Sequence, residues 1–141
     1  MKPKIKVLTL AVSDLERSLA FYRDGLGFPT DGIVGEESTD DAVVLFPMSE
    51  TLILALSPVA SLARDARITP TSSRLGAVAI GHAVGSNEEV DATMNRATSA
   101  GGVVTDPAKT RSWGGYSGFF HDPDGHLWQV AYHPEWDEPA D

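Results

Sequence analysis

The sequence contains no cysteine among its 141 residues. Disulfides, thiolate metal ligands and cysteine nucleophiles are therefore excluded, and any chemistry must come from nitrogen and oxygen groups. No apolar run approaches the length of a membrane span. The N-terminal stretch MKPKIKVLTLAVSDLE passes into helix-like sequence without the small-residue cleavage site of a signal peptide. Together these features predict a soluble, cytoplasmic protein.

Positive charge is also scarce. Eleven basic residues stand against 20 acidic ones, which gives a formal net charge of -9. Such a balance disfavours binding to nucleic acids and to anionic membranes. Several acidic residues collect in the last eight positions, 134–141, where a solvated tail is favoured over a cation site. The 42% hydrophobic content suffices for one domain with a sizeable core.

The first half of the chain has the pattern of a strand, a helix and three further strands. Residues 5–12 form an apolar, branched run that places Val7 and Thr9 on one face of a strand. Ser13 and Glu16 fit a helix capping box, and glycines near position 26 end the helical pattern. The weaker strands are expected around residues 30–34, 42–46 and 51–57.

The second half repeats this order after a polar connector at 58–73, which contains at most one helical turn near 60–66. A strand is expected over 75–84, followed by a helix that begins with a capping box of Ser86 and Glu89 and ends near Gly101. Three more strands are expected at 103–105, 115–120 and 126–132, the last two joined by the turn DPDG.

The repeated order predicts an internal duplication within a single α+β domain. Its modules span residues 1–57 and 74–133, and the connector and the acidic tail lie outside them. One helix covers only one face of each four-stranded sheet, so the other face needs a cover or a ligand. Two such sheets side by side would enclose a cleft.

Two segments carry a specific resemblance: LTLAVSDLERSLAFYRDGLGF near the start and WGGYSGFFHDPDGHLWQVAYHP near the end. The chain resembles the glyoxalase, bleomycin-resistance and extradiol-dioxygenase superfamily, also called vicinal-oxygen-chelate proteins, over nearly its whole length. The resemblance implies two βαβββ modules that form a cupped mixed sheet holding a small molecule. It also implies a homodimer and, in many members, a divalent metal.

The resemblance further implies metal ligands at four strand positions, which can be checked one by one. In the first strand the position falls on Val7, and in the strand that closes the first module it falls near Ala55. Neither side chain can coordinate a metal. In the last strand the position falls on Gln129, where relatives often carry Glu. A neutral amide adds no charge to offset the dehydration of a cation, so the usual metal site is expected to be degenerate.

The fourth position lies in the strand at 75–84, whose register the sequence leaves open. One register turns Ala79 inward and His82 against the helix, and the other turns His82 inward, because a slip of one residue reverses every side chain. His82 is therefore either a core histidine or a cavity group. If His82 faces the cavity, His82 and Gln129 are the alternative candidate ligands for a metal.

The remaining candidate ligand-binding residues are Thr9, Trp113 and Tyr116, beside Gln129 and His82. Gln129 should face the cup with its neighbours at alternate positions, although it could instead bond backbone or water. Trp113 and Tyr116 belong to a glycine-containing loop that could clamp a flat ligand. Trp113 could equally anchor that loop on the domain.

Histidines also flank the DPDG turn. His121 and His126 could form a surface metal pair, but a role in capping the turn is favoured by their position. No nucleophilic triad, phosphate loop or dinucleotide fingerprint is present.

The sequence thus favours a protein that binds a small organic molecule in its cup without the usual metal. The alternative is a lyase or isomerase of glyoxalase type, either metal-free or with a relocated divalent metal. Fold analogy alone does not choose between a binding protein and an enzyme.

Overall fold

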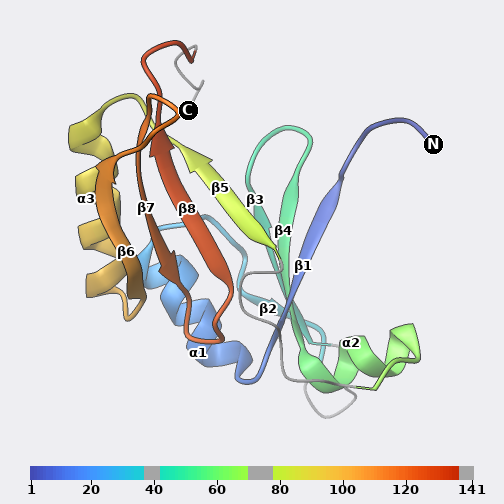
Figure 1. Ribbon diagram of the computed structural model, residues 1–141. Coiled ribbons are helices and arrows are strands. Elements are labelled where there is room, and N and C mark those ends of the chain that lie inside the picture. Colours follow the sequence, from blue (N-terminus) through green and yellow to red (C-terminus); the bar gives the residue numbers. More distant parts are fainter. Residues whose placement is uncertain (37–41, 70–77, 137–141) are drawn as a thin grey trace. The chain divides into compact units, whose positions relative to one another are not determined.

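The computed structural model describes residues 1–36, 42–69 and 78–136 (Figure 1). The chain separates into two compact units, Met1–Ser72 and Ser73–Asp141. No helix among the described residues is long and apolar enough to cross a membrane.

The N-terminal unit is a four-stranded mixed sheet with helices attached to it. Its elements in chain order are β1 (Val7–Val12), α1 (Leu15–Leu19), the π-helical continuation η1 (Ala20–Gly25), β2 (Ile33–Val34), β3 (Val43–Pro47), β4 (Ile53–Pro58) and α2 (Val59–Ala66). The strand order is β1-β4-β3-β2, with β1 parallel to β4 and the other neighbours antiparallel.

The first helix begins one residue later than the capping-box prediction. Asp14 is the N-cap, and its Oδ1 accepts a hydrogen bond from the Arg17 backbone N–H at 3.1 Å. The Ser13 hydroxyl oxygen instead accepts from the Arg17 side chain at 2.8 Å. Both residues are good N-caps, and the backbone places only Asp14 in the extended conformation directly before the first helical turn.

The N-terminal core lies between α1–η1 and one face of the sheet. The Tyr22 ring packs against Phe46 of β3 with centroids 5.9 Å apart, and both side chains are fully buried. Phe46 pairs with Leu54, which places Leu54 on this helix-facing side. Strand alternation then turns Val7, Thr9 and Ala55 to the opposite side, which we call the α1-distal face.

The C-terminal unit repeats the same topology. Its elements are β5 (Ala79–Ala83), α3 (Asn87–Ser99), β6 (Val103–Thr110), β7 (Tyr116–His121) and β8 (Leu127–Tyr132). The strand order is β5-β8-β7-β6, and β5 runs parallel to β8. The predicted α+β class and the repeated βαβββ order are confirmed.

The cap of α3 matches the sequence prediction closely. The Ser86 Oγ accepts from the Glu89 backbone N–H at 3.1 Å. The Glu89 carboxylate accepts from the backbone N–H of Gly85 at 2.7 Å, one residue before the position of a standard capping box. The predicted stripe of Val90, Met94 and Ala97 is buried.

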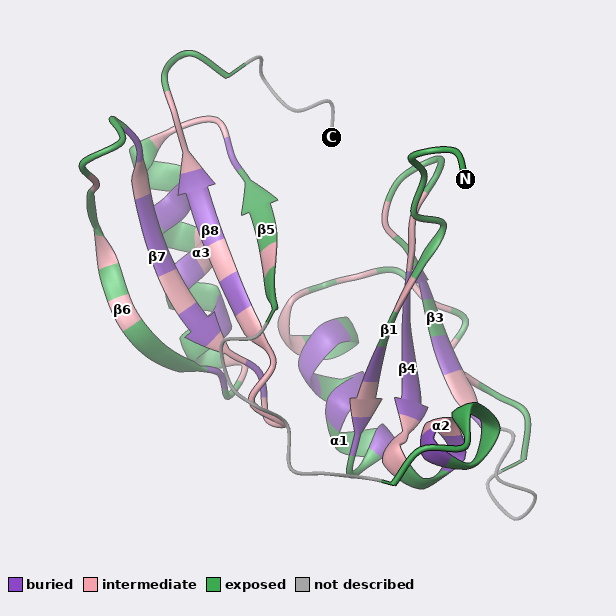
Figure 2. Ribbon diagram, turned by 45° about the vertical axis from the view of Figure 1, so that its right-hand side comes forward, coloured by how far each residue is buried: buried purple, intermediate pink, exposed green. Residues whose placement is uncertain are grey.

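Helix α3 covers one face of the C-terminal sheet, along β6, β7 and β8 (Figure 1). Phe120 and Trp128 stack beneath it with centroids 6.1 Å apart. A Cβ on Gly118 would lie 2.8 Å from the Met94 side chain, so this glycine also faces α3. The helix-facing residues Gly118, Phe120, Trp128 and Val130 are all buried, and the strands β7 and β8 are largely buried in Figure 2.

The opposite side of this sheet, which we call the α3-distal face, carries the alternate residues of β7 and β8. They are Ser117, Phe119, His121, Leu127, Gln129 and Ala131. The prediction that Gln129 shares a face with Leu127 and Ala131 agrees with this register.

Several element bounds differ from the sequence prediction. The strand expected at 30–34 is only two residues long, and the single turn expected near 60–66 is the eight-residue helix α2. The strand expected at 103–105 extends to Thr110, with shifts in its pairing to β7. Three parts of the prediction lie outside the described residues: the start of the predicted strand at 75–77, the connector residues 70–73 and the tail residues 137–141.

The DPDG turn has a clear internal anchor. The Asp122 carboxylate is fully buried, and its Oδ1 accepts from the backbone N–H groups of Asp124 and His126, each at 2.9 Å. Gly125 has a φ of +88°, which favours glycine. These hydrogen bonds and the glycine conformation agree with the turn that the sequence DPDG predicts.

Candidate functional site

Gln129 belongs to a polar network on the α3-distal face. Its side-chain Nε2 donates to the Ser117 Oγ at 3.3 Å. Ser117 is fully buried and is the residue of β7 diagonal to Gln129, because Gln129 pairs directly with Phe119. The amide plane is thus held by a neighbouring strand and is not a freely rotating surface group.

Arg111 closes the network from the start of the β6–β7 loop. Its Nε donates to the same Ser117 Oγ at 2.9 Å, and its terminal nitrogen Nη2 donates to the Ser117 carbonyl at 2.8 Å. The guanidinium lies 5.4 Å from the centre of the Phe119 ring, within cation–π range. The side chain is only 14% exposed.

Asp106 and Lys109 of β6 complete the charged part of the network. Arg111 Nη1 donates to Asp106 Oδ2 at 2.7 Å, and Lys109 Nζ lies 3.4 Å from the same oxygen. The hydrogen bond from Arg111 holds the pKa of the Asp106 carboxyl below its ordinary value against the opposing effect of desolvation, and Lys109 acts in the same direction as Arg111.

The pairing of β6 with β7 is irregular next to this charged cluster. Asp106 pairs with Phe119 and Lys109 with Ser117, so three steps along β6 correspond to two along β7. One extra residue on β6 disrupts the local ladder and redirects side chains. The guanidinium of Arg111 donates to the Ser117 carbonyl beside this irregular stretch.

His121 lies on the same face, two residues along β7 from Phe119. Its Nδ1 is 2.9 Å from the Asp122 carbonyl oxygen. A carbonyl can only accept a hydrogen bond, so Nδ1 is the donor in this contact and the Nε2 of the ring is left for other partners. The bond to Asp122 fits the turn-capping role that the sequence favoured for this histidine.

The residues at the family's metal positions do not fit a metal. On the α1-distal face, Val7 and Ala55 offer no donor atom. In β5, Ala79 pairs with Leu127 and shares its face, and it offers none either. Gln129 alone supplies an oxygen, and it is neutral. Within the described ranges, no group of three or more His, Cys, Asp or Glu residues could hold a metal ion.

The structure decides the register that the sequence left open for His82. His82 pairs with Val130 and Gly81 with Gln129 in the parallel β5–β8 ladder. Val130 is fully buried on the α3 side, so His82 lies on that side and Gln129 on the other. The alternative metal pair of His82 and Gln129 is therefore wrong, and His82 is not a residue of the α3-distal face. Its side chain is nevertheless exposed, because α3 leaves β5 largely uncovered (Figure 2).

Tyr116 was predicted to lie in the loop before the strand, as part of a ligand clamp, and the structure differs. It is the first residue of β7, and its hydroxyl donates to the Asp91 carboxylate of α3 at 2.7 Å. This hydrogen bond raises the pKa of the Tyr116 hydroxyl above its ordinary value, and desolvation and the negative charges of Asp91 and Glu88 add to the effect. Tyr116 ties the strand to the helix and does not clamp a ligand on the α3-distal face.

Trp113 packs against the segment that follows β8. Its ring stacks on His133 at 5.9 Å and on Trp136 at 6.1 Å between centroids. A Cβ on Gly115 would lie 1.9 Å from the Trp113 ring, so the ring occupies this place only because residue 115 has no side chain. These contacts match the loop-anchor interpretation, although 45% of Trp113 remains exposed.

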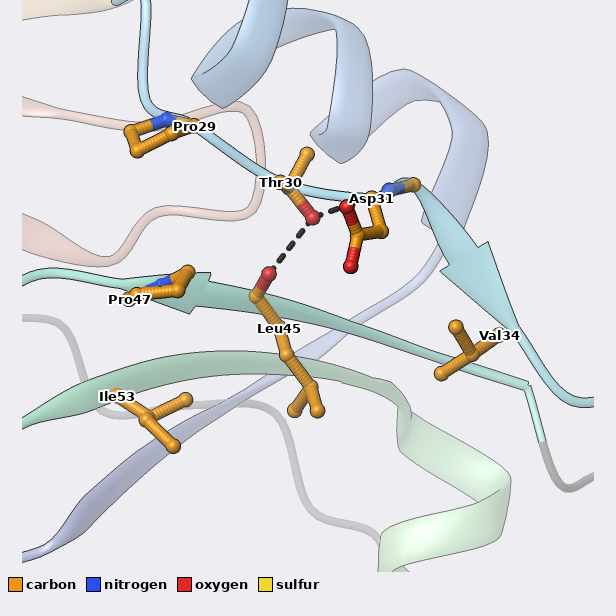
Figure 3. Close-up of a pocket in the computed structure, with 8 residues that line it drawn as sticks. Pro29, Thr30, Asp31, Val34, Leu45, Pro47 and Ile53 are labelled. Carbon is orange, nitrogen blue, oxygen red and sulfur yellow. Dashed lines mark hydrogen bonds between the residues drawn. The ribbon is translucent and has the colours of Figure 1, made fainter.

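Thr9 is exposed on the α1-distal face, and a separate hollow of about 400 Å³ lies on the same unit. Leu45, Pro47 and Ile53 form one wall of this hollow, and the loop from Pro29 to Gly32 forms another (Figure 3). The Thr30 hydroxyl donates to the Leu45 carbonyl at 2.6 Å, which holds the loop against β3. Thr9 itself is not among the lining residues.

Sequence reasoning missed Ser117, Arg111, Asp106 and Phe119 as members of one site. Their types carry no motif, and Arg111 stands at the start of the loop that contains Trp113 without a pattern of its own. The usable signal was alternation, because Ser117 and Phe119 occupy alternate positions on the strand next to Gln129. The bulge that brings Asp106 within reach of Arg111 leaves no clear trace in the sequence.

Comparison with known proteins is consistent with this architecture. The family model "Glyoxalase/Bleomycin resistance protein/Dioxygenase superfamily" matches residues 4–130. The chain belongs to this superfamily. No curated protein matches the sequence.

Solved structures give the same result. A glyoxalase-related enzyme from Fulvimarina pelagi is 34% identical, with 99% of this chain and 94% of that one covered and a TM-score of 0.86. The hypothetical protein SA1046 from S. aureus is 27% identical, with 94% and 95% covered and a TM-score of 0.75. The fosfomycin resistance protein FosX from Listeria monocytogenes shares the fold at 20% identity, with 96% and 97% covered and a TM-score of 0.69.

Proposed function

We propose that this protein binds a small organic molecule on the α3-distal face through Gln129, without the metal set usual in its superfamily. The observation that carries the proposal is the fixed amide of Gln129, held by Ser117 beside the Phe119 ring. The absence of donor atoms at Val7 and Ala55 supports the metal-free part of the proposal.

The α3-distal face offers both polar and apolar contacts to such a molecule. One amide hydrogen of Gln129 is used by Ser117, and within the described chain the second hydrogen and the amide oxygen have no recorded partner. Phe119, Leu127 and Ala131 surround the amide with apolar surface. A few fixed polar groups within an apolar surface are typical of small-molecule sites.

Metal titration tests the metal-free part of the proposal. Purified protein is stripped with chelator and titrated calorimetrically with Ni²⁺ and Zn²⁺. We expect no tight stoichiometric binding. His82→Ala is the matched control for Gln129→Ala, because it removes a side chain from the same pair of strands on the opposite face. Tight binding that Gln129→Ala abolishes and His82→Ala spares would overturn the metal-free proposal.

Ligand binding is tested by NMR on the full chain labelled with ¹⁵N. A panel of small aromatic and aliphatic compounds is added, and the side-chain amide signals of Gln129 are followed. We expect at least one compound to shift these signals in the wild-type protein. The same compound should bind Gln129→Ala more weakly. A panel that leaves the Gln129 and Phe119 signals unmoved would contradict the proposal.

His121 favours a second candidate, a metal-free lyase or isomerase of glyoxalase type. Because Nδ1 donates to the Asp122 carbonyl, the Nε2 of the neutral form of the ring would accept a proton from a carbon next to a carbonyl on a molecule anchored at Gln129. The glyoxalase-related enzyme at 34% identity adds weight to this candidate. The test is deuterium incorporation into small α-hydroxy ketones in D₂O. Exchange catalysed by wild type and lost in His121→Gln supports it, and equal exchange in both proteins contradicts it.

We also propose that the protein acts as a homodimer, as its superfamily resemblance implies. Light scattering after size-exclusion chromatography should give about twice the chain mass of 15.0 kDa. A mass of one chain across micromolar concentrations would refute this proposal.

A further inference from the structure

The charged end of the α3-distal face has a local charge opposite to that of the whole chain. Arg111 and Lys109 are two cations against the single carboxylate of Asp106, which leaves one positive charge. The complete chain carries a formal net charge of -9. The described residues of β7 and β8 on this face add no carboxylate, since they are Ser, Phe, His, Leu, Gln and Ala.

Arg111 is also incompletely used as a donor. A guanidinium has five N–H groups. The hydrogen bonds of Arg111 use Nε–H, one hydrogen on Nη1 and one on Nη2. Two N–H groups therefore remain without a partner in the described chain, on a side chain that is 14% exposed. Partly buried donors of this kind gain most from a charged acceptor, because such hydrogen bonds are about twice as strong as neutral ones.

We infer that the molecule bound at Gln129 is an anion whose carboxylate or phosphonate group lies against Arg111 and Lys109. This inference rests on the proposed function and names the ligand class of the same site. The Phe119 ring lies beneath the guanidinium and next to Gln129 in the sheet, so an apolar or aromatic part of the ligand can extend over it. The amide of Gln129 then contacts a polar group in the middle of the molecule.

The geometry disfavours a cationic ligand. The carboxylate of Asp106 is the one acidic group of the cluster, and both cations already lie within 3.4 Å of the same oxygen. A cation would have to displace one of them and would face the remaining positive charge. An anion instead adds to the two cations and leaves their bonds to Asp106 in place.

Lys109→Gln is the primary test variant because Lys109 is 59% exposed and its removal should not disturb folding. The probes are benzoate and phenylphosphonate as anions, benzyl alcohol as a neutral molecule and benzylamine as a cation. Each is titrated into the ¹⁵N-labelled full chain at low salt. Lys6→Gln is the control, since it removes an exposed lysine of the N-terminal unit with the same change in net charge.

We expect the anionic probes to bind wild type more tightly than the neutral probe, and the cation to bind most weakly. An exposed charge contributes about 0.2–1 kcal/mol, so Lys109→Gln should weaken the anions by a factor of about 1.4 to 5 and leave benzyl alcohol unchanged. Added salt should weaken the anions in wild type as well. Lys6→Gln should match wild type at equal ionic strength.

The outcomes separate the two proposals. If benzyl alcohol binds at Gln129 as well as the anions do, or benzylamine binds better, the anion inference is overturned and the proposed function stands. If Lys109→Gln and Lys6→Gln behave alike, the inference is overturned too. If no probe of any charge shifts the signals of this face, the proposed function fails and the inference fails with it. Arg111→Lys is a second variant, which keeps the charge, loses the planar fork and should also weaken the anions.

Discussion

Ser117→Ala tests whether the polar network of the α3-distal face holds this unit together as well as orienting Gln129. The Ser117 side chain is fully buried, and its Oγ accepts from Arg111 at 2.9 Å and from Gln129 at 3.3 Å. Alanine keeps the Cβ and removes only the oxygen. The substitution therefore deletes two hydrogen bonds with little change in packing.

The expected loss of stability follows from the two bonds. A hydrogen bond to a charged group contributes about 1.5–3 kcal/mol and a neutral one about 0.5–1.5 kcal/mol. Arg111 keeps its hydrogen bond to the Ser117 carbonyl at 2.8 Å, so the substitution removes only part of the stabilisation that Arg111 provides. The hydrogen bond from Gln129 is long, at 3.3 Å, and contributes less. We expect Ser117→Ala to lower the free energy of unfolding by about 1–2 kcal/mol.

Ser61→Ala is the matched control. Ser61 is a buried serine of α2 whose Oγ has no hydrogen-bond partner among the described residues. Removing a buried hydroxyl that makes no hydrogen bond relieves its desolvation cost, so Ser61→Ala should be neutral or stabilising. The pair thus compares one buried serine oxygen that accepts two bonds with one that accepts none.

Urea unfolding followed by far-ultraviolet circular dichroism measures both variants. All three tryptophans, Trp113, Trp128 and Trp136, belong to the C-terminal unit, so their fluorescence reports on the unit that contains Ser117. In Ser117→Ala the Gln129 side-chain amide should no longer be held in one orientation, and its NMR signals should change accordingly. Wild-type stability in Ser117→Ala, or an equal loss in Ser61→Ala, would refute this account of the network.

Two further predictions concern the contacts that replaced the expected clamp. Gly115→Ala should displace the Trp113 ring, because the added Cβ would lie 1.9 Å from it. The near-ultraviolet circular dichroism spectrum of this variant should lose the tryptophan signal. Gly81→Ala is the control and should keep the wild-type spectrum, because nothing lies within 4 Å of its Cβ position. Asp91→Asn should shift the ionisation of Tyr116 to lower pH, because Asp91 raises the pKa of this hydroxyl above its ordinary value of 10.0. Ultraviolet absorbance of the phenolate measures this shift, and an unchanged titration would contradict the role of the Asp91 bond.

Local patterns predicted most of the fold. The Ser86–Glu89 cap, the buried stripe of α3 and the DPDG turn each depend on residues within a few positions of one another, so sequence order alone specifies them. The N-cap of α1 shows the limit of this approach. Ser13 and Asp14 are both suitable caps, and the backbone conformation of the folded chain decides for Asp14.

The faces of strands were harder to predict because they depend on pairing. His82 could occupy either side of β5 until the ladder with β8 fixed it opposite Val130. Tyr116 was assigned to a loop, but it is paired with Tyr132 and therefore turned toward α3. The ladder thus settles an open register for His82 and replaces a loop by a strand for Tyr116, and each result removes a candidate from the α3-distal face.

The sequence by itself determined the family, the repeated module and the lack of metal donors at Val7 and Ala55, because these depend on residue identity at fixed spacings. The tertiary structure alone decided what surrounds Gln129. Arg111 bonds both Ser117 and Asp106 beside a stretch where the pairing of β6 with β7 is irregular, and strand pairing of this kind depends on the packing of whole strands. Gln129, for which the sequence showed no polar neighbour, is thereby linked through Ser117 to the cations Arg111 and Lys109.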